Sequence, residues 1–380
     1  MSKPLVLTCD IGTQSARALL VDPDGRIVDV VQSKYAEPYF SKEPGWAEQK
    51  PNFYFDRLCE CCRELCARSN ALLPDVIAMT ITVIRDTVVC LDANNEPLRD
   101  IILWLDKRTV DPNGAMPAKN MMLFKVAGME PTAKVVYAAS VGNWIMRHEP
   151  KIWARTAKYV MLPTYLNYKL TGNLIDSASN QIGHIPFDYK NRRWMKPGSL
   201  TRCFCDVPNE KLCDLVPSGT VIGTITDEVC ALTGIPAGLP LISTGSDKGC
   251  ETLGLAVVDS DKASISLGTT ATIQFSTTEY VEPQQFLPAY PGVLNDHYNP
   301  EIEIYRGLWL LSWFVKEFGT ADAIDAKEKG MAPEALLDER IRDLPAGSDG
   351  LLLQPYWTAG ILHPDSLGAV IGFSDYHTRY

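Results

Sequence analysis

The sequence of 380 residues contains no run of 18 uncharged apolar residues, so we expect no membrane-spanning helix. Basic residues are in the minority: 46 acidic side chains outnumber 36 lysines and arginines, and the net charge is -10. This acidic balance argues against nucleic acid or an anionic membrane as a partner. Residues 1–20 lack the cationic and apolar segments of a signal peptide, so we expect a cytoplasmic protein.

Familiar phosphate-binding motifs are also missing. The sequence has no G-x-x-x-x-G-K-[ST] loop and no G-x-G-x-x-G between a strand and a helix. It also has no H-E-x-x-H and no G-x-S-x-G. A P-loop or a dinucleotide fingerprint therefore cannot explain any phosphate chemistry in this chain.

The eleven cysteines lack the spacing of a zinc site. Cys59, Cys61, Cys62 and Cys66 cluster in "CECCRELC" with no histidine nearby. Cys59, Cys62 and Cys66 are spaced i, i+3 and i+7, which places them on one helical face. Free cysteine on such a face behaves as a small core hydrophobe. We therefore expect core thiols, and the cysteines as a whole fit a reducing compartment.

Apolar patterns of two different periods predict an α/β chain with two domains. The first three strands, separated by a short loop and by the turn "DPDG", should form an antiparallel meander. We place the least certain boundary at about residue 245, which gives domains 1–245 and 246–380. The main expected elements are strands near 4–10, 15–22, 26–35, 74–83, 86–98 and 238–245, a helix over 52–69, and mainly helical structure over 120–172.

The stretch "CDIGTQSARALLVDPDG" interrupts a strand pattern with polar residues. Backbone N–H groups around Gly12, with the side chains of Thr13, Gln14 and Ser15, can form a concave anion site. Asp10 would repel phosphate unless a cation lay between them, so it is a candidate Mg²⁺ ligand. Asp10 could equally form an Asx turn with its own backbone.

A weak internal repeat links this loop to a distant one. "SISLGTTAT" aligns Gly268 with Gly12 and Thr269 with Thr13, each between two apolar strands. Two such hairpins could face each other as two phosphate-binding loops. Two ordinary hairpins, each with a glycine at a positive φ, would show the same pattern.

Asp247 is the second candidate carboxylate. It follows an apolar strand in "STGSDKG", where small neighbours leave room for a ligand. Phosphoryl transfer to an alcohol needs a group that accepts the hydroxyl proton, and Asp247 could supply it. Asp247 could instead be the N-cap of the helix that follows. Lys248 beside it could pair with Asp247 or remain solvated.

Ordered blocks across nearly the whole chain resemble the FGGY family of carbohydrate kinases, which shares the ATPase fold of actin, hexokinase and Hsp70. These blocks are "DIGTQSARALLVD", "IRDTVVCLDANNEPLRDIILWLDKR", "YLNYKLTGNLIDSASNQIGHIPFDYKNRRW", "LVPSGTVIGTITDEVCALTGIPAGLPLISTGSDKGCETLGLAV" and "SISLGTTATI". The resemblance implies an α/β fold of two ribonuclease H-like lobes, with ATP and a sugar between them. It makes 1–245 the sugar-binding lobe and 246–380 part of the second lobe.

The resemblance also implies roles for the phosphate loops. Asp10, Gly12 and Thr13 match the family's first phosphate and Mg²⁺ loop, and we add Gln14 and Ser15 to the same ATP phosphate site. Residues of the second hairpin match the family's second phosphate loop, on the other lobe. They are Gly268, Thr269 and Thr270.

On the sugar side, Asp247 matches the family's catalytic base, which also contacts the substrate. Arg85 and Asp86 match an arginine–acid pair that holds substrate hydroxyls in the glycerol kinase branch. Trp104 resembles an aromatic wall against the carbon face of the sugar, although the residue alone reads as core packing. Asp106 and Arg108 complete the pattern W-x-D-x-R, and either substrate contact or bracing of the wall would explain them.

The sequence departs from the family at several places. Lys248 follows Asp247 where an amide is common, and Ser246 replaces a usual glycine. Lys248 could lower the pKa of Asp247 or contact substrate. Val83 and Ile84 replace the amide pair of glycerol kinases, which argues against glycerol as the substrate.

The chain ends at "VIGFSDYHTRY", where the family continues toward a glycine-rich adenosine motif. We therefore expect an incomplete second lobe and adenine-binding residues beyond this chain. A fragment of a longer kinase and a shortened product with poor nucleotide affinity would both fit.

The favoured function is ATP-dependent phosphorylation of a sugar or sugar alcohol, with a ketopentose such as xylulose or ribulose as the expected substrate. Two alternatives are a catalytically impaired sugar-binding or regulatory relative and a nucleotide-driven scaffold of the actin or Hsp70 kind. The expected partners are a small sugar or polyol, ATP and Mg²⁺. A homodimer is one option for the assembly, which the sequence leaves open.

Overall fold

The computed structural model describes residues 3–268, 270–284, 287–304, 307–357 and 366–378. The chain forms two compact units, which are treated separately below. The first combines residues 1–259 with 276–300, and the second combines 260–275 with 301–380. Residues 246–259 thus pack with the first unit. The division into family domains 1–245 and 246–380 is a different kind of boundary and stays a prediction.

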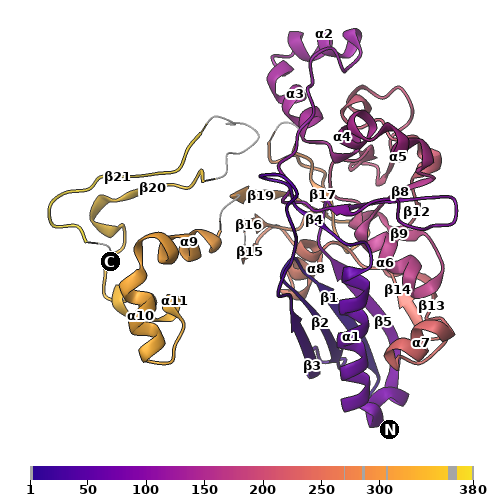
Figure 1. The fold of residues 1–380 in the computed structure, drawn as a ribbon, viewed down its shortest axis with the longest axis horizontal. Helices are drawn as coiled ribbons and strands as arrows, with labels where there is room; N and C mark the ends of the chain where they lie inside the picture. Colours follow the sequence, from indigo (N-terminus) through magenta and orange to yellow (C-terminus); the bar gives the residue numbers. More distant parts are fainter. Residues whose placement is uncertain (1–2, 269, 285–286, 305–306, 358–365, 379–380) are drawn as a thin grey trace. The chain divides into compact units, whose positions relative to one another are not determined.

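The main sheet of the described chain has six strands in the order β13-β14-β5-β1-β2-β3 (Figure 1). β14, β5 and β1 are parallel neighbours, whereas β1, β2 and β3 form the expected antiparallel meander. β13 pairs antiparallel with β14. The strands are β1 Leu5–Ile11, β2 Ser15–Val21, β3 Ile27–Lys34, β5 Val76–Val83, β13 Val221–Thr224 and β14 Pro240–Ile242.

Helix α1 (Phe53–Arg68) packs against β2 and β3 (Figure 1). Its cysteines Cys59, Cys61, Cys62 and Cys66 are all buried, which confirms them as core thiols. Cys61 was not expected on the buried face. It is buried because its Sγ lies 3.6 Å from the Ala16 carbonyl oxygen, on the sheet that α1 covers.

A second, four-stranded sheet in the described part of the first unit has the order β4-β7-β6-β8. The expected helical region precedes and follows β8, and Gly172 ends it at φ 80°, as predicted for a helix stop. The strands are β4 Glu48–Gln49, β6 Val88–Leu91, β7 Ile101–Ile102 and β8 Lys158–Met161. The helices are α2 Ala118–Val126, α3 Glu130–Ala139, α4 Val141–His148, α5 Pro150–Arg155 and α6 Leu162–Thr171.

Two further helices of the first unit are α7 (Asp227–Thr233) and α8 (Asp247–Gly254). Short strand pairs also belong to this unit. They are β9 Ile175–Ser177 with β12 Asp214–Val216, β10 Phe187–Asp188 with β11 Arg193–Trp194, and β17 Tyr290–Pro291 with β18 Tyr298–Asn299.

The second unit contains a sheet in the order β15-β16-β19, three helices and a hairpin, as far as the chain is described. The sheet strands are β15 Ser264–Leu267, β16 Ala271–Gln274 and β19 Glu301–Ile304. The helices are α9 Trp309–Phe318, α10 Thr320–Glu328 and α11 Pro333–Ile341, and the hairpin strands are β20 Leu352–Gln354 and β21 Ala369–Ile371. No helix within the described ranges is long and apolar enough to cross a membrane.

Candidate active site

The candidate residues of the first unit follow three neighbouring parallel strands. β1 leads into Gly12, β5 into Arg85 and Asp86, and β14 into Asp247. Because parallel strands place their carboxyl ends at the same edge of a sheet, ligand sites of α/β proteins form there. The sheet order therefore gathers at one edge residues that are as far apart as positions 12 and 247.

Hydrogen bonds tie the ends of these strands together. The Ile84 N–H donates to the Ile11 carbonyl at 3.0 Å, which joins the segment after β5 to the end of β1. The Thr82 hydroxyl donates to the Gly245 carbonyl at 3.2 Å, which joins β5 to the segment after β14. These bonds fix the backbone from which the candidate side chains project.

Asp247 is the first residue of α8, and it is not the N-cap. Ser246 occupies the cap, and its hydroxyl accepts a hydrogen bond from the Gly249 N–H at 3.2 Å. The capping alternative for Asp247 is therefore wrong, because a serine one position earlier already performs that role. The carboxylate of Asp247 accepts from the Lys248 N–H at 2.9 Å.

Arg85 pairs with Asp247, with 3.5 Å between Arg85 Nε and Asp247 Oδ1. Burial raises the pKa of Asp247 above its ordinary value, although Arg85 and Lys248 act in the opposite direction. The lowering of the Asp247 pKa that Lys248 could cause is thus outweighed by burial. The Lys248 ammonium pairs with Glu251 at 3.0 Å, so its side chain also has a carboxylate partner on its own helix.

Asp86 is held by a loop that the sequence did not single out. Its Oδ2 lies 2.7 Å from Nδ1 of His184, and its Oδ1 accepts from the His184 N–H at 2.9 Å. Asp86 has φ 45°, and its own N–H donates to the Ile182 carbonyl at 3.1 Å. Burial alone would raise the pKa of Asp86, but His184, with a smaller effect from Arg85, holds it below the ordinary value.

The first glycine loop connects to the predicted aromatic wall. The Trp104 Nε1–H donates to the Thr13 hydroxyl at 3.0 Å, so a phosphate-loop residue contacts a sugar-side residue. The Gly12 N–H donates to the Ser15 carbonyl at 3.0 Å, and the Gln14 carbonyl accepts from the Tyr35 N–H at 2.8 Å. The loop is therefore a closed, tethered turn.

Asp10 lies opposite Arg17 in the β1–β2 hairpin, and Arg17 Nη1 is 2.5 Å from Asp10 Oδ2. The described residues contain no group of three or more His, Cys, Asp or Glu side chains arranged to hold a metal ion. A single half-buried carboxylate beside a phosphate loop still fits Mg²⁺, which takes one or two carboxylates and obtains its other ligands from phosphate and water. Asp10 as a metal ligand stays a prediction.

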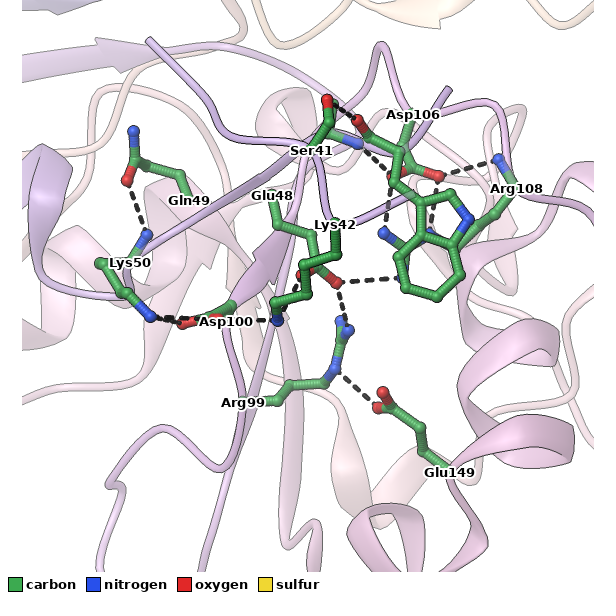
Figure 2. Close-up of polar contacts among 12 residues, drawn as sticks. Ser41, Lys42, Glu48, Gln49, Lys50, Arg99, Asp100, Asp106, Arg108 and Glu149 are labelled. Carbon is green, nitrogen blue, oxygen red and sulfur yellow. Dashed lines mark hydrogen bonds and ion pairs between the residues drawn. The ribbon is translucent and has the colours of Figure 1, made fainter. Parts of the chain in front are cut away.

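Asp106 and Arg108 brace the segment that carries Trp104. Figure 2 shows Glu48 between Arg99 and Arg108, with Glu48 Oε1 at 2.7 Å from Arg99 Nη2 and 3.1 Å from Arg108 Nη1. Arg108 also donates to both carboxylate oxygens of Asp106, from Nε to Oδ1 at 2.7 Å and from Nη2 to Oδ2 at 2.8 Å. Asp106 in turn accepts from the Ala47 N–H at 2.6 Å. The side chains of Asp106 and Arg108 are buried, so bracing explains them better than substrate contact.

The second glycine loop belongs to the other compact unit. Gly268 connects β15 to β16, and its N–H donates to the Thr270 carbonyl at 3.0 Å. Thr269 lies outside the described residues. A Cβ at Gly307 would come within 2.5 Å of the Thr270 carbonyl group, so the backbone approaches this hairpin closely. The facing arrangement of the two glycine hairpins stays a prediction.

Arg17 and His184 are among the residues that contact candidate site residues and that sequence reasoning missed. The hairpin register could have identified Arg17, because a residue seven positions after Asp10 falls opposite it across a short loop. His184 had only the weak signal of a preceding glycine in "QIGHIPFD". Its contact with Asp86 spans 98 positions in the chain, and sequence spacing does not reveal such a contact.

Comparison with known proteins decides the family. Residues 5–254 match the model of the FGGY family of carbohydrate kinases, N-terminal domain. The chain belongs to the FGGY family of carbohydrate kinases. Its enzyme class is therefore that of a phosphotransferase acting on carbohydrate, as the sequence resemblance implied.

Individual relatives extend this similarity over almost the whole chain. An uncharacterized sugar kinase, YgcE, of Escherichia coli (strain K12) is 26% identical over 374 residues, covering 98% of this chain and 68% of the relative. A xylulose kinase of Bacillus subtilis (strain 168) is 24% identical over 390 residues, covering 98% of this chain and 72% of the relative.

A solved gluconate kinase from Lactobacillus acidophilus superimposes with a TM-score of 0.79 and is 22% identical, over 99% of this chain and 74% of that one. The predicted fold of the actin and hexokinase type is confirmed.

Proposed function

We propose that this FGGY protein transfers the γ-phosphoryl group of ATP to a hydroxyl of a ketopentose such as xylulose or ribulose. The observation that carries this proposal is the convergence of Gly12, Arg85, Asp86 and Asp247 at the carboxyl ends of three adjacent parallel strands. A loop with backbone donors and a half-buried carboxylate are the two parts that phosphoryl transfer to an alcohol requires.

In this proposal Asp247 accepts the proton of the attacking hydroxyl while that oxygen forms its bond to phosphorus and the β–γ bridging bond breaks. Burial makes Asp247 a stronger base than an exposed carboxylate, because it raises the pKa. Arg85, at 3.5 Å, orients the carboxylate. The hydroxyls of Thr13 and Ser15 bind phosphate oxygens together with backbone N–H groups of the loop other than that of Gly12, which donates to Ser15. Bound Mg²⁺, with Asp10 as its protein ligand, would neutralise phosphate charge.

The choice of a ketopentose rests on two observations. One relative is named a xylulose kinase. In addition, Val83 and Ile84 offer no amide donors where glycerol kinases carry a pair, and both side chains are buried. A gluconate kinase of the same fold makes a sugar acid the competing substrate class.

Asp247→Asn tests the proposal directly. We expect it to abolish sugar-dependent ADP release and to leave sugar binding nearly intact, because the amide keeps the shape of the carboxylate but cannot accept the proton. Asp227→Asn is the matched control, since Asp227 also begins a helix directly after a capping hydroxyl. Turnover by Asp247→Asn at the wild-type rate would exclude Asp247 as the base.

A catalytically impaired sugar-binding relative is the second candidate, suggested by Lys248. The ion pair between Lys248 and Glu251 weakens that reason. Calorimetry with ATP and with D-xylulose separates the two candidates, since binding of the sugar without any binding of ATP would favour the impaired relative.

A further inference from the structure

His184 is fixed more firmly than an ordinary loop histidine. Asp86 accepts two hydrogen bonds from it, one from the backbone N–H and one from Nδ1. The preceding Gly183 is clamped as well, because the Tyr189 hydroxyl accepts from its N–H at 3.2 Å and donates to its carbonyl at 3.0 Å. A side chain at Gly183, whose φ is 152°, would clash with Asp86 Oδ1.

This clamp determines which nitrogen of the ring can serve a ligand. Nδ1 is committed to Asp86, and about 30% of the side chain remains exposed, so Nε2 is the ring atom left to meet a ligand. Burial lowers the pKa of His184, but Asp86 outweighs burial and raises the pKa above its ordinary value, which favours the ring with a proton on both nitrogens. With the Asp86 carboxylate 2.7 Å from Nδ1, the neutral ring keeps its proton on Nδ1 and Nε2 accepts. In the protonated ring, which this ion pair stabilises, Nε2–H donates.

The charges nearby place this donor at the candidate site. Arg85 follows β5 directly before Asp86, and its positive charge acts on both Asp86 and Asp247. The same guanidinium lies 5.5 Å from the ring centre of Tyr290. His184 thus contacts Asp86, whose neighbour in the chain, Arg85, pairs with the proposed catalytic base Asp247.

We propose that His184 binds the substrate and determines specificity, with Nε2–H donating to the oxygen of an oxidised carbon, such as the ketone of a ketose. This inference rests on the proposed function. Asp86 is then a positioning residue, which acts by holding the ring. A charged donor favours a carbonyl oxygen, which only accepts hydrogen bonds, over a hydroxyl that must also donate its own proton.

Two substitutions separate the two nitrogens of His184. Asparagine places an amide near the position of Nδ1, so His184→Asn keeps a donor to Asp86 and loses the outward donor. Glutamine reaches toward the position of Nε2, so His184→Gln keeps a donor that can reach the substrate and loses the donor to Asp86. His297→Asn is the matched control, because His297 also pairs with an aspartate at 2.7 Å but its Nε2 lies 3.1 Å from the Val258 carbonyl oxygen.

The full chain is titrated with D-xylulose and with xylitol by calorimetry, and its kinetics and thermal midpoint are measured. We expect His184→Asn to weaken D-xylulose binding about 10- to 100-fold, the loss of one charged hydrogen bond. Xylitol binding should change less, so the preference for the ketose should fall. KM should rise more than kcat changes, with the thermal midpoint preserved, and His184→Gln should be intermediate.

Three outcomes would overturn the inference. Wild-type affinity of His184→Asn for D-xylulose would remove His184 from the substrate site while leaving the proposed kinase function intact. Equal losses for both sugars with a lowered thermal midpoint would show a structural role. A wild-type protein that binds neither sugar would overturn the ketopentose assignment and this inference together.

Discussion

The two glycine hairpins share a sequence pattern and differ in how they are buried. In β1 the apolar side chains of Leu5, Leu7, Cys9 and Ile11 are buried in the core of the first unit. In β15 and β16 the order is reversed, because Ile265, Leu267 and Ile273 are exposed while alternate polar residues are buried.

Neighbouring strands explain the apolar face in the second unit. The register pairs Ile265 with Ile273 and Ile273 with Ile302, so these side chains form one row across β15, β16 and β19. On the opposite face Thr272 and Gln274 are buried. The comparison teaches that a hairpin pattern identifies the turn and its strands, whereas the elements packed on the sheet decide which face is buried.

The loops also differ by one residue in pairing. Ile11 lies opposite Ala16 in the first hairpin, whereas Leu267 lies opposite Ala271 in the second. Aligning the two glycines therefore does not align the strands that follow them. The repeat is therefore inexact as a structural repeat.

The largest effect that the comparison predicts is on stability. Leu7→Ala should lower the free energy of unfolding by about 2–5 kcal/mol, because Leu7 is only 1% exposed and its loss leaves a cavity. Ile265→Ala, at a residue 62% exposed, should change it by no more than about 0.5 kcal/mol. Urea unfolding followed by circular dichroism measures both. A cost at Ile265 as large as that at Leu7 would show that this sheet face is covered in solution.

A smaller effect should distinguish the hydroxyls of the two loops. Thr13→Val removes the acceptor of the Trp104 N–H, and the loss of one neutral hydrogen bond should raise the KM for sugar about 2- to 10-fold. Thr270→Val should affect the KM for ATP and leave the KM for sugar unchanged. Steady-state kinetics with each substrate varied in turn gives both constants. Equal effects of the two variants on the sugar KM would remove this distinction between the hairpins.

The smallest expected effect is a shift in the pH dependence of kcat. It contrasts Lys248 and Glu251, two charged residues of α8 that act on Asp247 in opposite directions. The pKa of Asp247 is raised in the folded protein, so the active carboxylate is lost as pH falls through a value above that of an ordinary aspartate. Lys248 lowers this pKa and Glu251 raises it. Lys248→Met should therefore move the acid limb of the kcat profile to higher pH, and Glu251→Gln should move it to lower pH. Shifts in the same direction would contradict the assignment of that limb to Asp247.

Local sequence signals were sufficient for several of the elements. The alternation in residues 5–21 predicted the first hairpin, and the spacing of Cys59, Cys62 and Cys66 predicted a buried helical face. They left open whether Asp247 caps the helix that follows it, and the structure shows that the preceding serine is the cap. Both residue types cap helices well, so their order alone could not decide between them.

The sequence by itself determined the strands, the helices, the glycine turns and the family to which the chain belongs. Those features depend on side-chain period, on backbone freedom and on motifs that lie within a few tens of residues. Only the tertiary structure decided that β14, β5 and β1 lie side by side, and that Asp86 holds His184. Parallel pairing and a contact across 98 positions depend on which distant segments pack together, and no local pattern encodes that choice.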